Sequence, residues 1–314
     1  MTRNIESSKN DKKTQETSSE STVHYIDTTG PAKAYIRKKS FWAKVRDLRL
    51  SIKISFLVLI VLALMTIFAE WLAPHNPYEP NLQARNNPPS LTHPLGTDYI
   101  GRDTLSRTIY ALRTSVGIAM TGVIVGTLLG ATLGIAAGLF KGIVDRVVSS
   151  LIDFFYAIPN ILIVLIGIAV FGTETWVLIA LISFARWHST ARVVRGQVYS
   201  LVTVPSVEAA IALGSTYRRV AVKHLLPNLT SVLVVDMTMK FPALIILEST
   251  LSFLGLGVQP PIASLGAMIG DGRDYLISAP LIALSPSLFL VGLVMCFQII
   301  GDWIRDLSDV RQFD

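Results

Sequence analysis

Residues 114–139 read TSVGIAMTGVIVGTLLGATLGIAAGL and contain no charged side chain. A helix on the surface of a soluble protein buries only one apolar stripe, whereas a helix that crosses a bilayer needs about 20 consecutive, mostly apolar residues. The length and the uninterrupted apolar character of this stretch therefore predict a membrane-spanning helix.

Five further segments of the chain have the same apolar character. The whole sequence of 314 residues is 51% hydrophobic and 16% charged, with one cysteine, and its mean hydropathy of +0.51 exceeds what soluble domains usually show. The sequence therefore predicts an all-α integral membrane protein. The six expected transmembrane helices lie at residues 53–73, 114–139, 148–171, 174–190, 229–253 and 281–302.

Glycine recurs at every fourth position of the second span. A period of four places these residues on one face of the helix, where the absence of side chains lets another backbone approach closely. We interpret them as helix-packing residues, and the sequence leaves open whether the partner helix belongs to this chain or to another. The residues are Gly122, Gly126, Gly130, Gly134 and Gly138.

Lysine and arginine near the span ends predict the orientation, because cytoplasmic loops carry an excess of both. With the N-terminus inside, the cytoplasmic side carries most of the basic residues, and Arg107 and Arg113 fit least because they lie near a span on the outer side. We therefore predict a multi-pass protein of the cell (cytoplasmic or inner) membrane with both termini in the cytoplasm.

The region before the first span divides into two parts. Residues 1–40 are polar and almost free of large apolar side chains, which is typical of a disordered cytoplasmic tail. Residues 41–52 alternate apolar and basic residues at helical spacing, which favours an interfacial amphipathic helix, although a plain basic flank remains an equal alternative. The six-helix transmembrane domain then covers residues 53–310.

The sequence contains none of the motifs that mark an enzyme active site. A GxxxxGK[ST] phosphate loop, HExxH, CxxC and GxSxG are all absent, so we expect no catalytic residue. The five histidines are scattered, and we expect no metal site. The net charge of +6 does not indicate a nucleic-acid partner, because the basic residues flank apolar spans.

The connection at residues 191–228 is longer than a link between spans requires. Residues 207–213 favour a helix, which Gly214 is expected to end as a C-terminal cap. A second short helix at residues 217–226 is expected to end at Pro227. A short exposed helix of this kind suits docking into a partner's groove, and a solvated surface helix is the alternative.

The fifth span carries the ionisable residues Asp236, Lys240 and Glu248, which are costly in a membrane unless they are paired or face water. Asp236 and Lys240 lie four residues apart and can meet on one helix face. We interpret them as a self-neutralising structural pair, and a polar patch that lines a translocation path is the alternative. Pro159 and Pro242 are expected to kink their helices.

The long cytoplasmic connection resembles the EAA loop of ABC importer permeases. The tripeptide EAA at 208–210, the glycine six residues after its first member and the segment HLLPN at 224–228 have that family's spacing. The resemblance implies a coupling helix that seats in a cleft of an ATPase subunit. The implied ATPase-coupling residues are Glu208, Ala209, Ala210, Gly214, His224 and Pro227.

Two further segments are similar to the C-type permeases of the oligopeptide/dipeptide(/nickel) family. They are HPLGTD at 93–98 with GRDTLSR at 101–107, and LSFLGLGVQPP at 251–261. The resemblance covers residues 41–310 and implies the type I ABC importer permease fold. Glu248 matches the family pattern near the outer end of the fifth span, where it is placed to line an outer gate. Leu265 departs from the pattern, which commonly has tryptophan there.

The resemblance implies half of a translocation path, with short peptides as the favoured solute. The implied partners are a second homologous permease subunit, two ABC ATPase subunits that bind ATP and Mg, and an extracytoplasmic solute-binding protein that lands on residues 74–113 and 254–280. No cofactor is expected in this chain, and the lipid bilayer surrounds it. The alternatives are import of nickel or another metal complex, an ion-driven secondary transporter, and a scaffold that transports nothing.

Overall fold

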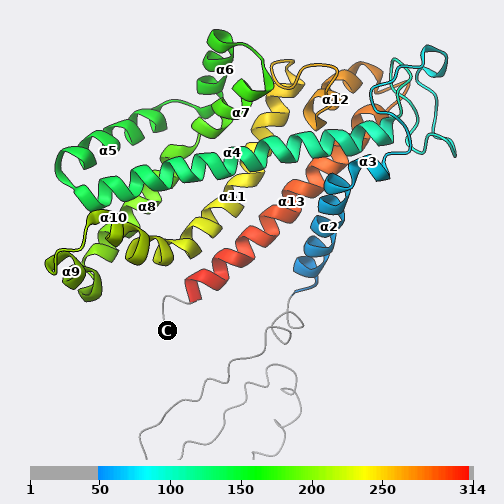
Figure 1. The fold of residues 1–314 in the computed structure, drawn as a ribbon. Coiled ribbons are helices and arrows are strands. Elements are labelled where there is room, and N and C mark those ends of the chain that lie inside the picture. Colours follow the sequence, from blue (N-terminus) through cyan, green and yellow to red (C-terminus); the bar gives the residue numbers. More distant parts are fainter. Residues whose placement is uncertain (1–48, 311–314) are drawn as a thin grey trace, which may run out of the picture. The chain divides into compact units, whose positions relative to one another are not determined.

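The computed structural model describes residues 49–310, shown as a ribbon in Figure 1. The expected tail at residues 1–40 and most of the expected interfacial helix at 41–52 lie outside the described residues. Within residues 49–310 the chain forms helices and no β-strand, apart from one isolated bridge between Thr97 and Asp103. The α-helices are α2 (Leu50–Ile67), α3 (Ala69–Leu72), α4 (Thr104–Phe140), α5 (Gly142–Ala157), α6 (Asn160–Phe171), α7 (Thr175–Phe184), α8 (Trp187–Val202), α9 (Pro205–Ala212), α10 (Tyr217–Val220), α11 (Leu226–Phe253), α12 (Leu265–Gly272) and α13 (Leu281–Val310).

Five helical segments are long and apolar enough to cross a membrane, and the count is six if the bent pair of α5 and α6 is taken as one broken span. The all-α membrane fold predicted from the sequence is therefore confirmed. The five segments are Leu50–Ile67, Thr104–Phe140, Thr175–Val202, Tyr217–Phe253 and Leu281–Ser308.

Helix α4 is the longest single α-helix within residues 49–310 and contacts most of the others (Figure 1). Its 37 residues span about 55 Å at 1.5 Å per residue, which exceeds the hydrocarbon thickness of a bilayer. The Asp103 carboxylate caps its first turn by accepting from the Ser106 backbone N–H at 2.8 Å. Helices α7 and α8 pack along one side of α4, and α11, α13 and α2 pack along another.

All five glycines of the period-four pattern face α7 and α8. A Cβ atom built on Gly126 would lie 2.7 Å from the carbonyl oxygen of Ser183, and one on Gly134 would lie 2.7 Å from that of Ala191. Real Cβ atoms essentially never come this close, so the two backbones can approach only because these positions are glycine. The partner helix that the sequence left open belongs to this chain.

The third expected span, residues 148–171, is not one kinked helix. The chain forms α5 and α6, whose axes meet at 92°. Pro159 lies between them, and Ile158 before it is extended at φ −108° and ψ 128°, the conformation that a following proline favours. Pro242, by contrast, remains inside α11 without ending it.

The end of the fourth expected span, at residue 190, was predicted too early. The connection that was expected to begin at residue 191 begins after Val202 in the structure. Helix α8 continues to Val202. Ala191, Val194 and Val198 are fully buried, and they pack against the glycine face of α4. This packing stabilises the helix although arginines separate its apolar residues, which is why hydropathy alone predicted a loop.

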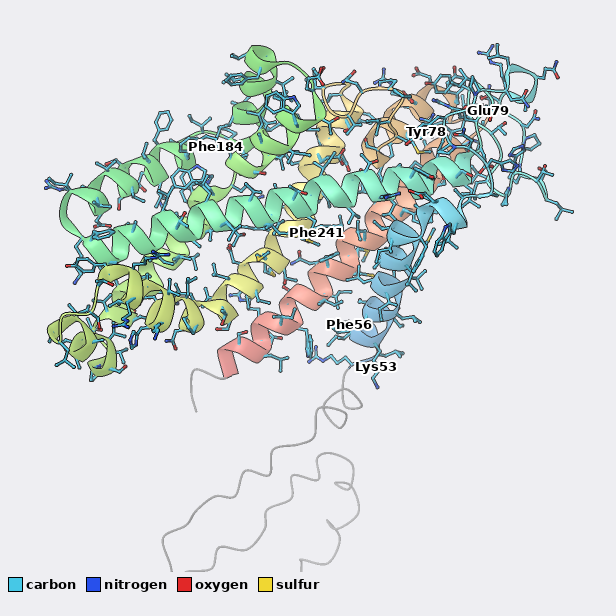
Figure 2. The ribbon with its side chains drawn as sticks, in the orientation of Figure 1. Lys53, Phe56, Tyr78, Glu79, Phe184 and Phe241 are labelled. Carbon is cyan, nitrogen blue, oxygen red and sulfur yellow. The ribbon has the colours of Figure 1, made fainter. Side chains whose placement is uncertain are left out.

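Three apolar clusters hold the described helices together, and the smallest of them joins α5 to α4 and α8 around Val148, Ile152 and Trp187. The largest surrounds Phe241 of α11, which Figure 2 labels and which is 1% exposed. Its ring stacks on Phe297 of α13 with 4.0 Å between ring centroids. The second joins α4 and α8 to α9, α10 and α11, and includes Val207 and Val220. The short helices α9 and α10 are therefore packed against the long apolar helices.

Candidate functional site

Helix α9 ends in a complete Schellman motif. Gly214 has φ +82°, its N–H donates to the Ile211 carbonyl at 3.0 Å, and the Ser215 N–H donates to the Ala210 carbonyl at 3.0 Å. These two bonds satisfy carbonyl groups that the end of the helix would otherwise leave unpaired. The turn at Gly214 thus has a fixed geometry, and it points the chain directly into the next helix.

The second short helix does not end at Pro227, contrary to the expectation from the sequence. Helix α10 passes through a π-helical turn, Ala221–Leu225, into α11, with Pro227 in the first turn of α11. Pro227 has no N–H to donate, but it does not end the helical element, which continues from the π-helical turn into α11. The Asn228 side-chain amide donates to the His224 carbonyl at 2.6 Å. The segment Tyr217–Phe253 therefore runs as one long helical element.

Helix α9 presents an exposed face beside this long element. Glu208 and Ala209 are exposed, Ala210 is partly buried, and Leu213 is 87% exposed. Val207, by contrast, is 3% exposed and packs inward. One face of α9 is thus anchored in the bundle, and the other offers a carboxylate and a large apolar side chain to a partner.

Asp236 and Lys240 meet between α11 and α8. The Lys240 ammonium lies 2.8 Å from the Asp236 carboxylate and also contacts the Thr190 hydroxyl, which itself donates to Asp236 at 2.8 Å. The two charged side chains are 9% and 14% exposed, and Thr190 is fully buried. The charges neutralise each other inside the bundle, and α8 supplies a third polar partner that helical spacing did not predict.

The Glu248 carboxyl is completely buried among serine hydroxyls. Ser252 donates to it at 2.8 Å and Ser249 at 3.2 Å, and the side chains of Ser115 of α4 and Ser264 lie next to it. The group therefore joins α4, α11 and the start of α12. It faces no open water in this conformation, although the resemblance had placed it at an outer gate.

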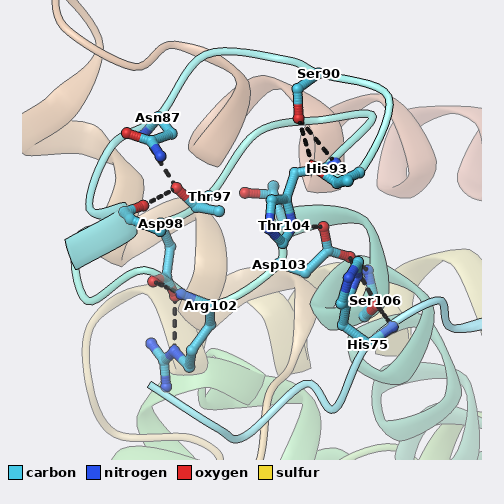
Figure 3. Close-up of polar contacts among 12 residues, drawn as sticks. His75, Asn87, Ser90, His93, Thr97, Asp98, Arg102, Asp103, Thr104 and Ser106 are labelled. Carbon is cyan, nitrogen blue, oxygen red and sulfur yellow. Dashed lines mark hydrogen bonds and ion pairs between the residues drawn. The ribbon is translucent and has the colours of Figure 1, made fainter. Parts of the chain in front are cut away.

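Before α4, a buried ion-pair cluster fixes the loop of residues 73–103. The Asp98 carboxylate accepts from the Arg102 guanidinium at 2.7 Å (Figure 3). It also lies 3.5 Å from the guanidinium of Arg107. All three side chains are at most 8% exposed. Arg113 pairs with Glu70 at 3.0 Å. The two arginines that least fitted the charge distribution therefore have acidic partners close by.

A cavity of about 510 Å³ opens beside this cluster, between the loop before α4 and the segment 252–275. Partial burial raises the pKa of the Tyr99 hydroxyl on its wall, and this hydroxyl donates to Asp271 at 3.3 Å. The Arg107 side chain reaches the cavity wall, and its buried Nη1 atom has no hydrogen-bond partner among the residues that the structure describes. The main charged and aromatic lining residues are Tyr99, Arg102, Arg107, Asp271, Arg273 and Tyr275.

Two of the histidines that looked scattered in the sequence come together in the fold. His75 follows α3 and His93 lies in the loop before α4, and both rings face Asp103. Their ring centroids are 4.6 Å apart. No spacing rule predicts this group, because the long loop folds back on itself to bring residues 75 and 93 together.

The long apolar helices define a multi-pass membrane protein. Residues 126–313 match the family model described as the binding-protein-dependent transport system inner membrane component, and residues 51–89 match that of the N-terminal TM domain of oligopeptide transport permease C. The chain therefore belongs to the family of binding-protein-dependent transport system inner membrane components and is a permease subunit of an ABC importer.

Named relatives agree with this family. The chain is 34% identical to the dipeptide transport system permease protein DppC of Bacillus subtilis (strain 168), over 86% of this chain and 84% of that protein. It is 35% identical to the glutathione transport system permease protein GsiD of Shigella flexneri serotype 5b (strain 8401), over 86% and 89%. Its fold is similar to an inward-facing structure of the MetNI methionine ABC transporter, with TM-score 0.51, 20% identity, and coverage of 64% and 96%.

Proposed function

We propose that this subunit forms half of the translocation path for short peptides. ATPase subunits that bind α9 would drive the transport. One observation carries the proposal: the capped, exposed helix α9 leads directly into a helical element that runs from Tyr217 to Phe253. A pull on α9 would therefore act along a spanning helix whose far end borders the outer cavity. Coupling works only if the two states of the path bind the ATPase differently.

Peptides are the proposed solute class, because the named relatives carry dipeptide and glutathione in their descriptions, and glutathione is itself a tripeptide. Import of nickel or another metal complex remains the second candidate. In either case the proposed solute-binding protein would make most of the selection, as the family design implies.

The proposed assembly contains a second homologous permease subunit, two ABC ATPase subunits and an extracytoplasmic solute-binding protein. ATP and Mg would bind on the ATPase subunits, and this chain would contribute no catalytic group. Both termini and α9 would lie in the cytoplasm. The outer cavity and the loops 74–113 and 254–280 would then face the solute-binding protein.

The test combines purification with uptake. The tagged chain is isolated in mild detergent, the co-purifying proteins are identified, and their ATPase activity is assayed. We expect ATPase subunits and a second permease to be recovered, and to be lost with Glu208→Lys. Labelled di- and tripeptides should enter cells only when the gene is present.

Equal peptide uptake with and without the gene would contradict the peptide assignment. Recovery of the chain without any ATPase, together with uptake that follows the proton gradient, would contradict the importer mechanism. That result would favour an ion-driven transporter with Asp236, Lys240 and Glu248 as its polar groups.

A further inference from the structure

We infer that His75, His93 and Asp103 form a binding site for a divalent transition-metal ion of the Zn²⁺ class at the base of α4. Two imidazoles and one carboxylate are a common ligand set for Zn²⁺, and they leave a fourth position for water. The site joins the chain just after α3 to the segment just before α4.

The three candidate ligand atoms already lie close to one another. Asp103 Oδ1 lies 2.9 Å from His93 Nδ1, and Asp103 Oδ2 lies 4.0 Å from His75 Nδ1. All three ligand atoms lie within 4.8 Å of one another. Ligands at about 2 Å from a tetrahedral ion are about 3.3 Å apart, so shifts of less than about 1 Å would complete the geometry.

The carboxylate is held in place by groups that are not ligands. Asp103 is fully buried, and its Oδ2 accepts from the Ser106 backbone N–H at 2.8 Å and from the Ser106 hydroxyl at 2.6 Å (Figure 3). The His75 backbone N–H donates to the same hydroxyl at 3.1 Å. Outer partners of this kind orient metal ligands and are worth about 10- to 100-fold in affinity.

The negative charge of Asp103 remains available to a cation. The neighbouring guanidinium groups of Arg102 and Arg107 pair with Asp98. Within residues 49–310, the ion pairs recorded for Asp103 involve only the two histidines. The His75 side chain is 42% exposed and that of His93 is 24% exposed, so an ion can reach the site from solution.

The competing explanation is a purely structural hydrogen bond between His93 and Asp103. That bond needs neither His75 nor an ion, whereas a metal site needs all three ligands. His75 therefore distinguishes the two explanations, and because its side chain is 42% exposed we expect its replacement to leave the fold intact.

The experiment uses the full chain in detergent, purified through a tag that contains no histidine and treated with a chelator. Titration with Zn²⁺ and with Co²⁺ measures stoichiometry by elemental mass spectrometry and geometry by the visible absorption of Co²⁺. We expect one ion per chain, and at least a tenfold loss of affinity in His75→Ala and in His93→Gln. Asp103→Asn, which keeps an N-cap acceptor, should weaken binding similarly.

His224→Ala is the matched control, because His224 lies in the π-helical turn and outside this cluster, and it should bind as the wild type does. Hydrogen exchange of residues 76–92 should slow on addition of Zn²⁺ in the wild type and not in His75→Ala. The inference fails if no ion binds at micromolar concentration, or if all variants bind equally. It does not rest on the solute or on the ATPase, so neither result bears on the importer assignment.

Discussion

At the scale of single residues, the glycines of α4 make the sharpest prediction. A Cβ on Gly130 would meet the Trp187 carbonyl and the Thr190 side chain, whereas one on Gly117 of the same helix meets nothing within 4 Å. We expect Gly130→Ala to destabilise the protein by about 1–3 kcal/mol through overpacking. Gly117→Ala should be neutral or stabilising by up to about 1 kcal/mol, because alanine favours helices.

Thermal unfolding of both variants in detergent, followed by size-exclusion chromatography, gives the comparison. Equal melting temperatures for Gly130→Ala and Gly117→Ala would show that α4 and α8 are farther apart than the structure places them.

The Asp236–Lys240 pair makes a second prediction. Lys240→Met removes the ammonium partner of the Asp236 carboxylate, which keeps its hydrogen bond from Thr190, and loss of one partner of a buried pair costs about 3–5 kcal/mol. Adding Asp236→Leu removes the unpaired charge and should restore most of the stability. If the pair is structural, the double variant also restores uptake. A stable double variant that transports nothing would instead place the pair on the path.

The sequence could predict part of this geometry and not the rest. Helical spacing brings Asp236 and Lys240 together whatever the tertiary fold, because positions i and i+4 are neighbours on any helix. Thr190 lies on another helix, so its contact depends on how α8 packs. The convergence of His75 on Asp103 likewise depends on a loop path that no local propensity encodes.

At the scale of elements, the Schellman turn after α9 can be tested through its glycine. Gly214→Pro cannot adopt φ +82° and lacks the N–H that bonds to Ile211, so the turn must change. We expect loss of solute uptake with normal membrane insertion. Glu208→Lys should have the same effect through charge reversal on the exposed face. Glu174→Lys, an equal charge change at the exposed start of α7, serves as the control.

Uptake of labelled peptide and the amount of protein in isolated membranes are the two measurements. Normal uptake with both Gly214→Pro and Glu208→Lys would refute α9 as the coupling helix. Loss of the protein from the membrane would instead show that the turn matters for folding.

Element boundaries were predicted least well, for identifiable physical reasons. Hydropathy averages over a window, so the arginines of α8 lowered the average and indicated a loop. The apolar face of α8 is nevertheless fully buried. A proline indicates that a helix is interrupted, but the 92° turn at Pro159 is set by the packing of α5 and α6. The π-helical turn before Pro227 has no recognised sequence signal.

At the scale of the whole molecule, the orientation in the membrane is open to direct test. Cys296 is buried and is the only cysteine, so a Cys296→Ala background accepts single reporters. An impermeant maleimide should label Ser90→Cys in intact cells, and Ala209→Cys only after permeabilisation, because both positions are exposed. The opposite labelling pattern would reverse the topology that the basic residues indicate.

The class of the protein, and five of its six expected spans, could be predicted because bilayer thickness fixes the length of an apolar helix. The pairing of the helices could not be predicted. Lipid and the protein interior are similarly apolar, so hydropathy does not separate a face that contacts lipid from one that contacts another helix. Exposed apolar residues on α2, α6 and α13, such as Leu57, Ile166 and Leu288, fit lipid or another subunit equally well.

The close contact of the α4 glycines with α7 and α8 also limits which mutations this gene can tolerate. Glycine has no smaller substitute, so every missense mutation at these positions adds atoms to a contact that is already closed. At Gly126, Gly130 and Gly134 the nearest opposing atom is a backbone carbonyl oxygen, which no second mutation can remove. At Gly122 and Gly138 it belongs to a side chain. Intragenic suppressors should therefore arise for the two ends of the row and never for its middle.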